Sequence, residues 1–322
     1  MDANFRTARA VGRWYLRCSA KHRRRGLEHL QAALGGEQGL DLAEINRCSF
    51  EHLMQLFMVE AMQAPRLLQP ESWHRHVSIN PTCEHTQRAV ALLKEGRPAI
   101  FVTGHCGNWE LLGFVLSLLG FPMTALARPL DNPYLNRWVM GVREARGLQV
   151  LTKFGASDEA VRVLRDGGRL GFIADQDAGG DGLFVPYFGR FASAYKSIAL
   201  LAMSQGVPII VGGAFRTGTG FQYRLVVQDL ISPADWADAD DPLYLLTARF
   251  TRGIEQMVRQ YPEQYLWIHR RWKSRPRHER DGLPVPDRFA RKVRSLPWLS
   301  ADEAETLLHR SSSATLPIGA AP

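Results

Sequence analysis

Hydrophobic positions recur along this chain in two different patterns. From residue 97 onward, short apolar runs alternate with stretches of helical periodicity. Short apolar runs bounded by Gly, Pro and polar residues are typical of buried strands, and longer amphipathic stretches are typical of helices that cover a sheet. The alternation predicts an α/β fold with a mixed central sheet flanked by helices. The expected strands span residues 98–102, 123–127, 170–174, 207–211, 223–227 and 266–268, and the expected helices span 109–119, 132–146, 157–165, 197–204 and 243–260.

The regions outside this alternation have other patterns. Arginines recur at helical spacing from Arg6 to Arg17, beside an imperfect apolar side that includes Phe5 and Trp14, which predicts a basic interfacial helix. Residues 40–62 have the period of a helix that packs on the core. We therefore expect three parts, which are a basic amphipathic N-terminal segment (1–39), one α/β domain (40–295) and a loose C-terminal tail (296–322).

Charge is unevenly distributed along the chain, whose formal net charge is +8. Residues 1–25 hold eight bases and one acid, and residues 270–294 hold ten bases and three acids. Each segment therefore carries +7, which leaves −6 for the remainder. Basic flanks on an acidic body are expected where a protein meets phosphates on a membrane, a nucleic acid or an acidic protein, although a solvated charged face has the same composition.

The cysteine spacing and the longest apolar runs exclude other classes. The four cysteines are widely spaced, without the Cys-x-x-Cys or Cys/His clusters of zinc sites and disulfide frameworks. The sequence has neither a signal-peptide core nor a run of about 18 uncharged apolar residues. We therefore expect a reducing compartment, no metal site, and neither an export signal nor a membrane-spanning helix.

One segment combines a histidine and an acid in a promising context. His105 and Glu110 are separated by five residues, which on a continuous helix would place them about 140° apart. Here a predicted strand precedes His105 and a helix capped by Asn108 follows it, so Glu110 can fold back toward the imidazole. Backbone N–H groups of residues 107–109 and the positive end of the helix dipole would then face a developing oxyanion.

Two other interpretations of this segment stay open. A buried structural histidine satisfied by a nearby glutamate would have the same spacing. Cys106 is a conceivable thiol nucleophile, although adjacent residues in a tight turn usually point apart. Other schemes find no support, because the sequence contains no Gly-x-Ser-x-Gly elbow, no Walker-type phosphate loop and no complete Gly-x-Gly-x-x-Gly after a strand.

The segment Gly104-His-Cys-Gly-Asn-Trp-Glu110 resembles the His-x-x-x-x-Asp/Glu motif of the lauroyl/myristoyl-type lysophospholipid acyltransferase family of lipid A biosynthesis. Further blocks recur in the order of that family, and together they cover residues 95–276. They are Arg128-Pro-Leu-Asp-Asn132-Pro133, Arg143-Glu-Ala-Arg146-Gly147, Ala174-Asp175-Gln-Asp177 with residues 182–190, and residues 262–273.

The resemblance implies a glycerol-phosphate-acyltransferase-like single catalytic domain and a role in lipopolysaccharide biosynthesis. The implied reaction moves a fatty acyl chain from a thioester, typically on acyl carrier protein, to a hydroxyl of a lipid A precursor or similar glycolipid. In this scheme His105 takes the hydroxyl proton and Glu110 orients the imidazole. No metal and no cofactor is expected, because a thioester is already activated.

The resemblance also implies binding residues. Arg128, Asn132 and Arg143 are expected to contact phosphates of the acceptor or donor, and Asp175 is expected to be the functional member of its block at the substrate site. The tryptophans of residues 267–273 more often serve packing, and His269 is expected not to be catalytic.

Several expectations concern partners and location. Many family members carry an N-terminal transmembrane helix, which this sequence lacks, so peripheral attachment to the cytoplasmic face of the inner membrane is implied. An acyl-CoA-dependent acyltransferase for another membrane phospholipid or glycolipid fits the same residues. A noncatalytic basic protein that binds membrane or nucleic acid is the alternative of another class. Nucleic acid is not expected as a partner, because the body is acidic and lacks a recognised reading motif.

Overall fold

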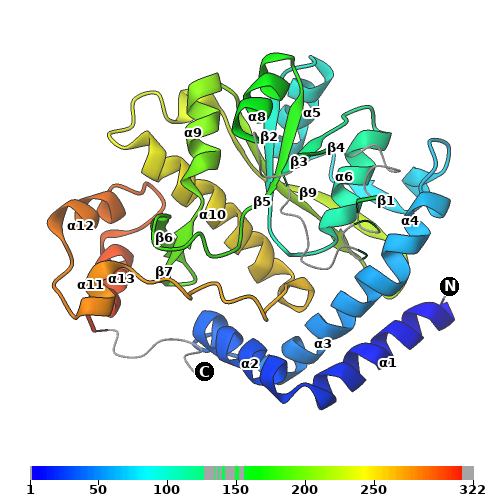
Figure 1. The fold of residues 1–322 in the computed structure, drawn as a ribbon, viewed down its shortest axis with the longest axis horizontal. Helices are drawn as coiled ribbons and strands as arrows, with labels where there is room; N and C mark the ends of the chain where they lie inside the picture. The colour runs from blue at the N-terminus through cyan, green and yellow to red at the C-terminus, as the bar shows by residue number, and fades with distance from the viewer. Residues whose placement is uncertain are drawn as a thin grey trace.

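A seven-stranded sheet forms the centre of the protein (Figure 1). The computed structural model describes residues 2–126, 134, 137, 140–141, 149–151 and 156–313. Neighbouring strands are parallel except for β8 and β9, which are antiparallel. The prediction of an α/β fold with a mixed sheet is therefore confirmed. In spatial order the strands are β1 (Val77–Ile79), β9 (Tyr223–Ile231), β8 (Ile209–Arg216), β2 (Ala99–Thr103), β5 (Arg169–Ile173), β3 (Thr124–Leu126) and β4 (Gln149–Leu151).

Both faces of the sheet are covered, so its central strands are apolar throughout. All five residues of β2 are buried. Ala99 and Phe101 pack with helices on one face, while Ile100 and Val102 pack on the other, as the two-residue period of a strand requires. The first face carries α5 (Glu84–Lys94) and α6 (Trp109–Leu118), and the second carries α8 (Ala156–Arg165), α9 (Lys196–Gln205) and α10 (Pro242–Gln260).

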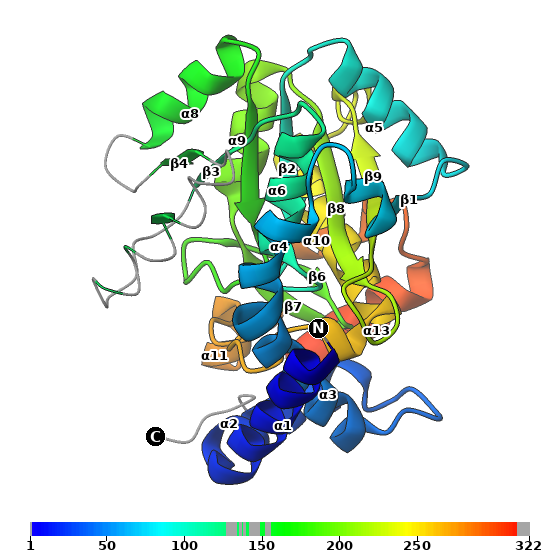
Figure 2. The same cartoon turned by 90° about the vertical axis from the view of Figure 1, so that its right-hand side faces the viewer.

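The helices α1, α2 and α3 lie together below the sheet, opposite α5 and α8 (Figures 1 and 2). Since α5 and α8 precede β2 and β5, the carboxyl ends of these strands point toward α1–α3. Short helical segments continue the chain from α3 back to the sheet. The bounds are α1 (Asp2–Cys18), α2 (Ala20–Leu34), α3 (Leu42–Gln55), the π-helical η1 (Leu56–Glu60), α4 (Ala61–Leu67) and the 3₁₀ segments η2 (Trp73–Arg75), η3 (Pro233–Asp235) and η4 (Pro262–Gln264).

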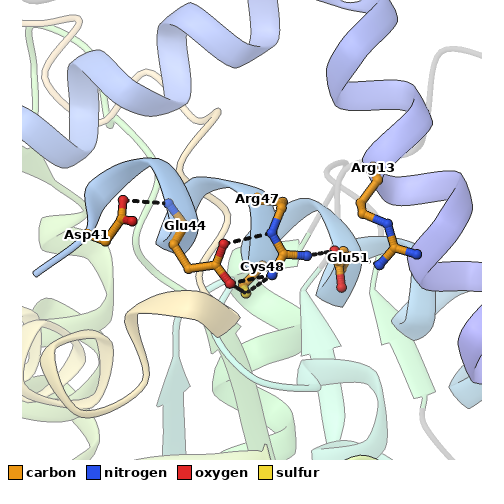
Figure 3. A network of polar contacts seen from close by, with 6 residues as sticks. All are labelled: Arg13, Asp41, Glu44, Arg47, Cys48 and Glu51. Carbon is orange, nitrogen blue, oxygen red and sulfur yellow. Dashed lines mark hydrogen bonds and ion pairs between the residues drawn. The ribbon is translucent and has the colours of Figure 1, made fainter.

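The basic N-terminal helix packs on the protein through its apolar side. Phe5 and Leu16 of α1 are buried, and Gly12 allows close approach to α3, because a Cβ there would lie 2.8 Å from Glu51 Cα. At the same contact Arg13 pairs with Glu51 at 3.1 Å. Arg47 of α3 bonds both Glu44 and Glu51, as Figure 3 shows. Phe5 and Leu16, on the side predicted to face a membrane, are therefore packed against the protein, whereas Trp14 of the same side is exposed.

The chain beyond residue 296 is not loose throughout. Helix α13 buries Ala304, Leu307 and Leu308 in a cluster with the β6–β7 hairpin. This cluster gives the C-terminal segment an apolar partner that its composition alone did not reveal; residues 314–322 lie outside the described part. The elements are β6 (Leu183–Tyr187), β7 (Arg190–Ala194), α11 (Arg277–Asp281), α12 (Asp287–Arg294) and α13 (Ala301–Ser313).

Two other predicted elements need comment. The expected strand at 266–268 is wrong, because this stretch makes a turn after a single bridge between Cys106 and Tyr265. The apolar run at 266–268 is short, and the Leu266 N–H donates a hydrogen bond to the His105 carbonyl oxygen. The expected helix at 132–146 falls mostly outside the described residues. None of the described helices has the length and apolar character needed to cross a membrane.

Candidate active site

A tight turn connects β2 to α6 and presents His105. Asn108 ends the turn and caps the helix, since its Oδ1 accepts a hydrogen bond from the Leu111 N–H at 2.8 Å. Gly107 has a φ of +60°. A Cβ on Gly107 would lie 2.2 Å from the Ala214 carbonyl oxygen, so only glycine fits this position.

Asp175 holds the His105 imidazole. Because β2 and β5 are parallel neighbours, the segments that follow them meet at the same edge of the sheet. His105 Nδ1 lies 2.7 Å from Asp175 Oδ1, and the His105 backbone N–H donates to Oδ2 at 2.9 Å. The Asp175 side chain is 0% exposed, whereas that of His105 is 16% exposed.

Asp175 stays ionised although its side chain is buried. Burial alone would raise the pKa of this carboxyl, but the charge and hydrogen bonds of His105, with a smaller contribution from His269, hold the pKa below its usual value. An ionised Asp175 favours the tautomer of His105 that carries its proton on Nδ1. Nε2 is then left to accept a proton, which is the geometry of a general base.

This pairing differs from the predicted roles of two acids. The sequence predicts that Glu110 orients the imidazole and that Asp175 contacts substrate. In the structure Asp175 takes the orienting position, and its carboxylate is fully buried against His105. Glu110 stands in the first turn of α6, as predicted, but there it lines the neighbouring apolar pocket.

The apolar pocket, about 70 Å³ in volume, lies next to Trp109, the neighbour of the His105 ring. The Trp109 ring lines it and also contacts the His105 ring, with 5.0 Å between the centroids. One residue of the pocket wall therefore contacts the base, and most of the wall is apolar, as a hydrocarbon chain requires. The lining residues are Phe101, Thr103, Trp109, Glu110, Leu112, Gly113, Met123, Ala125, Leu126, Gly171, Phe172 and Ile173.

The backbone donors expected for an oxyanion are only partly available. The Gly107 N–H donates to the Gln264 carbonyl oxygen at 2.9 Å, and the Asn108 N–H donates to that of Ala214 at 2.7 Å. These two donors hold the turn in place. The Trp109 N–H, the first of α6, has no hydrogen-bond partner within the described part of the chain.

A buried polar network that the sequence did not indicate supports the turn. His52 of α3 bonds the Gly107 carbonyl oxygen through Nε2 (2.9 Å) and Arg216 of β8 through Nδ1 (2.9 Å). Arg216 pairs with Glu60 at 3.0 Å, and Glu60 accepts from the Asn108 amide at 2.7 Å. Burial, followed by the Arg216 charge, lowers the pKa of His52 to about 3, so this imidazole is neutral.

The remaining candidates are placed as follows. Cys106 is buried, and burial above all raises the pKa of its thiol, which disfavours the thiolate that a nucleophile requires. Arg128, Asn132 and Arg143 lie outside the described residues. Within the described part of the chain, no three His, Cys, Asp or Glu side chains are grouped so that they could hold a metal ion.

Comparison with known proteins identifies the family of the chain. The family of bacterial lipid A biosynthesis acyltransferases matches residues 2–274. The chain belongs to that family. It is accordingly an O-acyltransferase, and the matched residues include the segment at the end of β2.

The sequence identity to individual relatives is low. The chain is 23% identical over 279 residues to lipid A biosynthesis acyltransferase 2 of Shigella flexneri, which covers 85% of each protein. It is 30% identical to the lipid A biosynthesis palmitoleoyltransferase of Escherichia coli over 186 residues, or 56% of this chain and 58% of the relative. It is 28% identical to a phosphatidylinositol mannoside acyltransferase of Mycolicibacterium smegmatis over 41% of this chain and 45% of the relative.

Proposed function

We propose that this acyltransferase moves a fatty acyl chain from a thioester on acyl carrier protein to a hydroxyl of a lipid A precursor or similar glycolipid. The observation that carries the proposal is the His105–Asp175 pair beside the apolar pocket. An oriented imidazole can activate a hydroxyl, and the pocket offers a place for the acyl chain. Membership of the family supports the lipid A-type acceptor.

The proposed chemistry needs one base and one acid step. The acceptor hydroxyl oxygen attacks the thioester carbonyl carbon while His105 Nε2 takes the hydroxyl proton. Asp175 stabilises the imidazolium, and the positive end of α6 stabilises the oxyanion. The intermediate then collapses, the C–S bond breaks, and the imidazolium returns its proton to the thiolate. The proposed reaction uses no cofactor.

Other parts of the proposal concern substrate binding. Arg128, Asn132 and Arg143 are proposed phosphate contacts, and Glu110 is a proposed second carboxylate of the site at the pocket wall. The two strongly basic segments of the sequence support attachment to the anionic cytoplasmic face of the inner membrane without a spanning helix.

A second acceptor or donor class has specific support. The similarity to the mycobacterial phosphatidylinositol mannoside acyltransferase favours a phospholipid-based glycolipid as the alternative acceptor, with acyl-CoA as the alternative donor. Parallel assays with acyl carrier protein and CoA thioesters, each with a lipid A precursor and a mannosylated phosphatidylinositol, separate these pairs by product formation.

The mechanism is tested with purified wild type and the variants His105→Ala, Asp175→Asn and Glu110→Ala, each checked for native circular dichroism. Labelled acyl carrier protein and a lipid A precursor are the substrates. We expect His105→Ala and Asp175→Asn to lose about 10² to 10⁴ in rate, because the first lacks the base and the second favours the wrong tautomer. A Glu110→Ala loss equal to that of Asp175→Asn would give both carboxylates a role in catalysis. Full activity of His105→Ala would refute the mechanism, and no product from wild type with any donor and acceptor pair would favour the noncatalytic binding alternative.

A further inference from the structure

A second imidazole stands against the catalytic one. The His269 ring centroid lies 4.6 Å from that of His105, and the two ring planes are inclined by 54°. His269 Nε2 is buried and has no hydrogen-bond partner among the described residues. A buried polar nitrogen without a partner costs about 1–3 kcal/mol, so it is expected where a ligand completes the bond.

The turn that carries His269 is firmly attached to the active-site edge of the sheet. Its anchors are short polar contacts with the segments that follow β2 and β5. They run from the Leu266 N–H to the His105 carbonyl oxygen (3.0 Å), from Arg271 Nη1 to the Gln176 carbonyl oxygen (3.4 Å), and from Ser274 Oγ to Asp177 Oδ2 (2.8 Å). The closeness of the two rings is therefore built into the fold and does not depend on one flexible side chain.

His269 is in the protonation state of a hydrogen-bond donor. Burial lowers its pKa to about 4; the positive charge of His105 acts in the same direction, and the charge of Asp175 opposes it. At neutral pH the ring is uncharged and carries one N–H. A neutral imidazole next to a reacting carbonyl can polarise it by donating that hydrogen, without adding a positive charge beside the base.

The site also needs such a donor. The N–H groups of Gly107 and Asn108 are already used within the protein. The Trp109 N–H, the first of α6, is still available as a backbone donor. Two or more donors usually stabilise a tetrahedral oxyanion, so a side-chain donor beside the Trp109 N–H would complement it.

Contrary to the expectation from the sequence, we propose that His269 is a further catalytic residue, whose Nε2–H donates a hydrogen bond to the thioester carbonyl oxygen and to the oxyanion formed from it. This inference rests on the proposed acyl transfer. His269 transfers no proton in the step. The bond between the acceptor oxygen and the carbonyl carbon forms as described above, and the negative charge that develops on the carbonyl oxygen is stabilised.

Two substitutions separate hydrogen bonding from packing. His269→Phe keeps a ring against His105 and removes the donor, whereas His269→Gln loses the ring and keeps an N–H. We expect His269→Phe to lower kcat about 10²- to 10³-fold with little change in KM, and His269→Gln to recover at least about tenfold of that loss. His278→Gln is the control, because His278 is another buried histidine, bonded to Ser311 in the C-terminal helices. A Phe variant as active as wild type, or more active than the Gln variant, would overturn the proposal.

A binding measurement keeps this test independent of the substrate. A long-chain alkyl phosphonate resembles the charged tetrahedral intermediate and needs no acceptor. By calorimetry we expect it to bind His269→Phe at least about tenfold more weakly than wild type, and His269→Gln less weakly. If wild type makes no product from any tested acceptor but the phosphonate distinguishes the variants, the proposed acceptors are wrong and His269 is still a hydrogen-bond donor to a tetrahedral anion at this site. Equal phosphonate binding by wild type and His269→Phe overturns the role of His269, whatever the acceptor.

Discussion

Gly107 shows how a single residue can determine the shape of the turn that presents His105. Its backbone is in the left-handed region, and its missing side chain leaves room for the Ala214 carbonyl oxygen. The two costs of a side chain, backbone strain and collision, can be separated in this chain. Gly206 has the same φ of +60° but no atom within 4 Å of its would-be Cβ.

We predict that Gly206→Ala costs about 1 kcal/mol in the free energy of unfolding, the cost of strain alone, and leaves activity unchanged. Gly107→Ala is predicted to cost at least about 2 kcal/mol more, because the Cβ collides with backbone that cannot move aside. It is also predicted to lose activity, because the collision displaces His105. Urea unfolding and the acyl-transfer rate measure the two effects, and equal losses for both variants would contradict this account.

At the scale of elements, sequence patterns predict the features that depend on residues adjacent in the chain. The strand before His105, the turn and the Asn108 cap are all recognisable, because an apolar run, two glycines and a capping residue act on adjacent backbone. The partner of His105 is not recognisable, because Asp175 is 70 residues away and reaches it only because β5 lies beside β2. The roles of His52 and Glu60 beside the turn are not recognisable for the same reason. Both belong to residues 40–62, whose helical period indicates only packing.

The contact of α3 with the turn predicts a pH dependence of stability. His52 has a pKa of about 3 when folded and an ordinary value of 6.5 when unfolded. Between these values the unfolded chain binds more protons, so this contribution to stability is complete above about pH 6.5 and falls as the pH drops toward 3.

His52→Gln keeps a donor for the Gly107 carbonyl oxygen and removes the titration. From pH 7 to pH 5 we expect wild type to lose about 2 kcal/mol more unfolding free energy than the variant. Urea titrations at the two pH values measure the difference, and parallel losses in both proteins would exclude His52 as a buried neutral group.

The contact between α1 and α3 can be tested in a similar way. Gly12→Leu places a side chain against the backbone of Glu51, so α1 must move away. We predict that trypsin then cleaves the first forty residues faster and that the protein loses about 1–3 kcal/mol of stability. Ala10→Leu adds the same side chain on the exposed side of α1 and is expected to change neither property. Equal cleavage of both variants would mean that α1 is not held by this contact.

At the scale of the whole molecule, the exposed apolar side chains suggest which side faces a lipid acceptor. Since the apolar side of α1 is occupied by α3, its Phe5 and Leu16 cannot enter a membrane without unpacking the helix. Phe57, Met58 and Met62, in contrast, are exposed on η1 and α4. The Phe57 ring contacts that of Trp109 at 6.4 Å, and Trp109 contacts His105.

We therefore predict that Phe57, Met58 and Met62 of η1 and α4 insert into the bilayer next to the proposed active site. Replacing Phe57, Met58 and Met62 together by Ser should weaken sedimentation with anionic phospholipid vesicles about tenfold or more, because interfacial binding scales with the apolar area buried. Activity should fall on acceptor in vesicles and persist on acceptor in detergent micelles. The control is Leu200→Ser with Leu283→Ser, which removes similarly exposed apolar side chains from other elements. If both sets of substitutions weaken vesicle binding equally, general surface hydrophobicity and charge hold the protein on the membrane, and the active site gains no fixed orientation from η1 and α4.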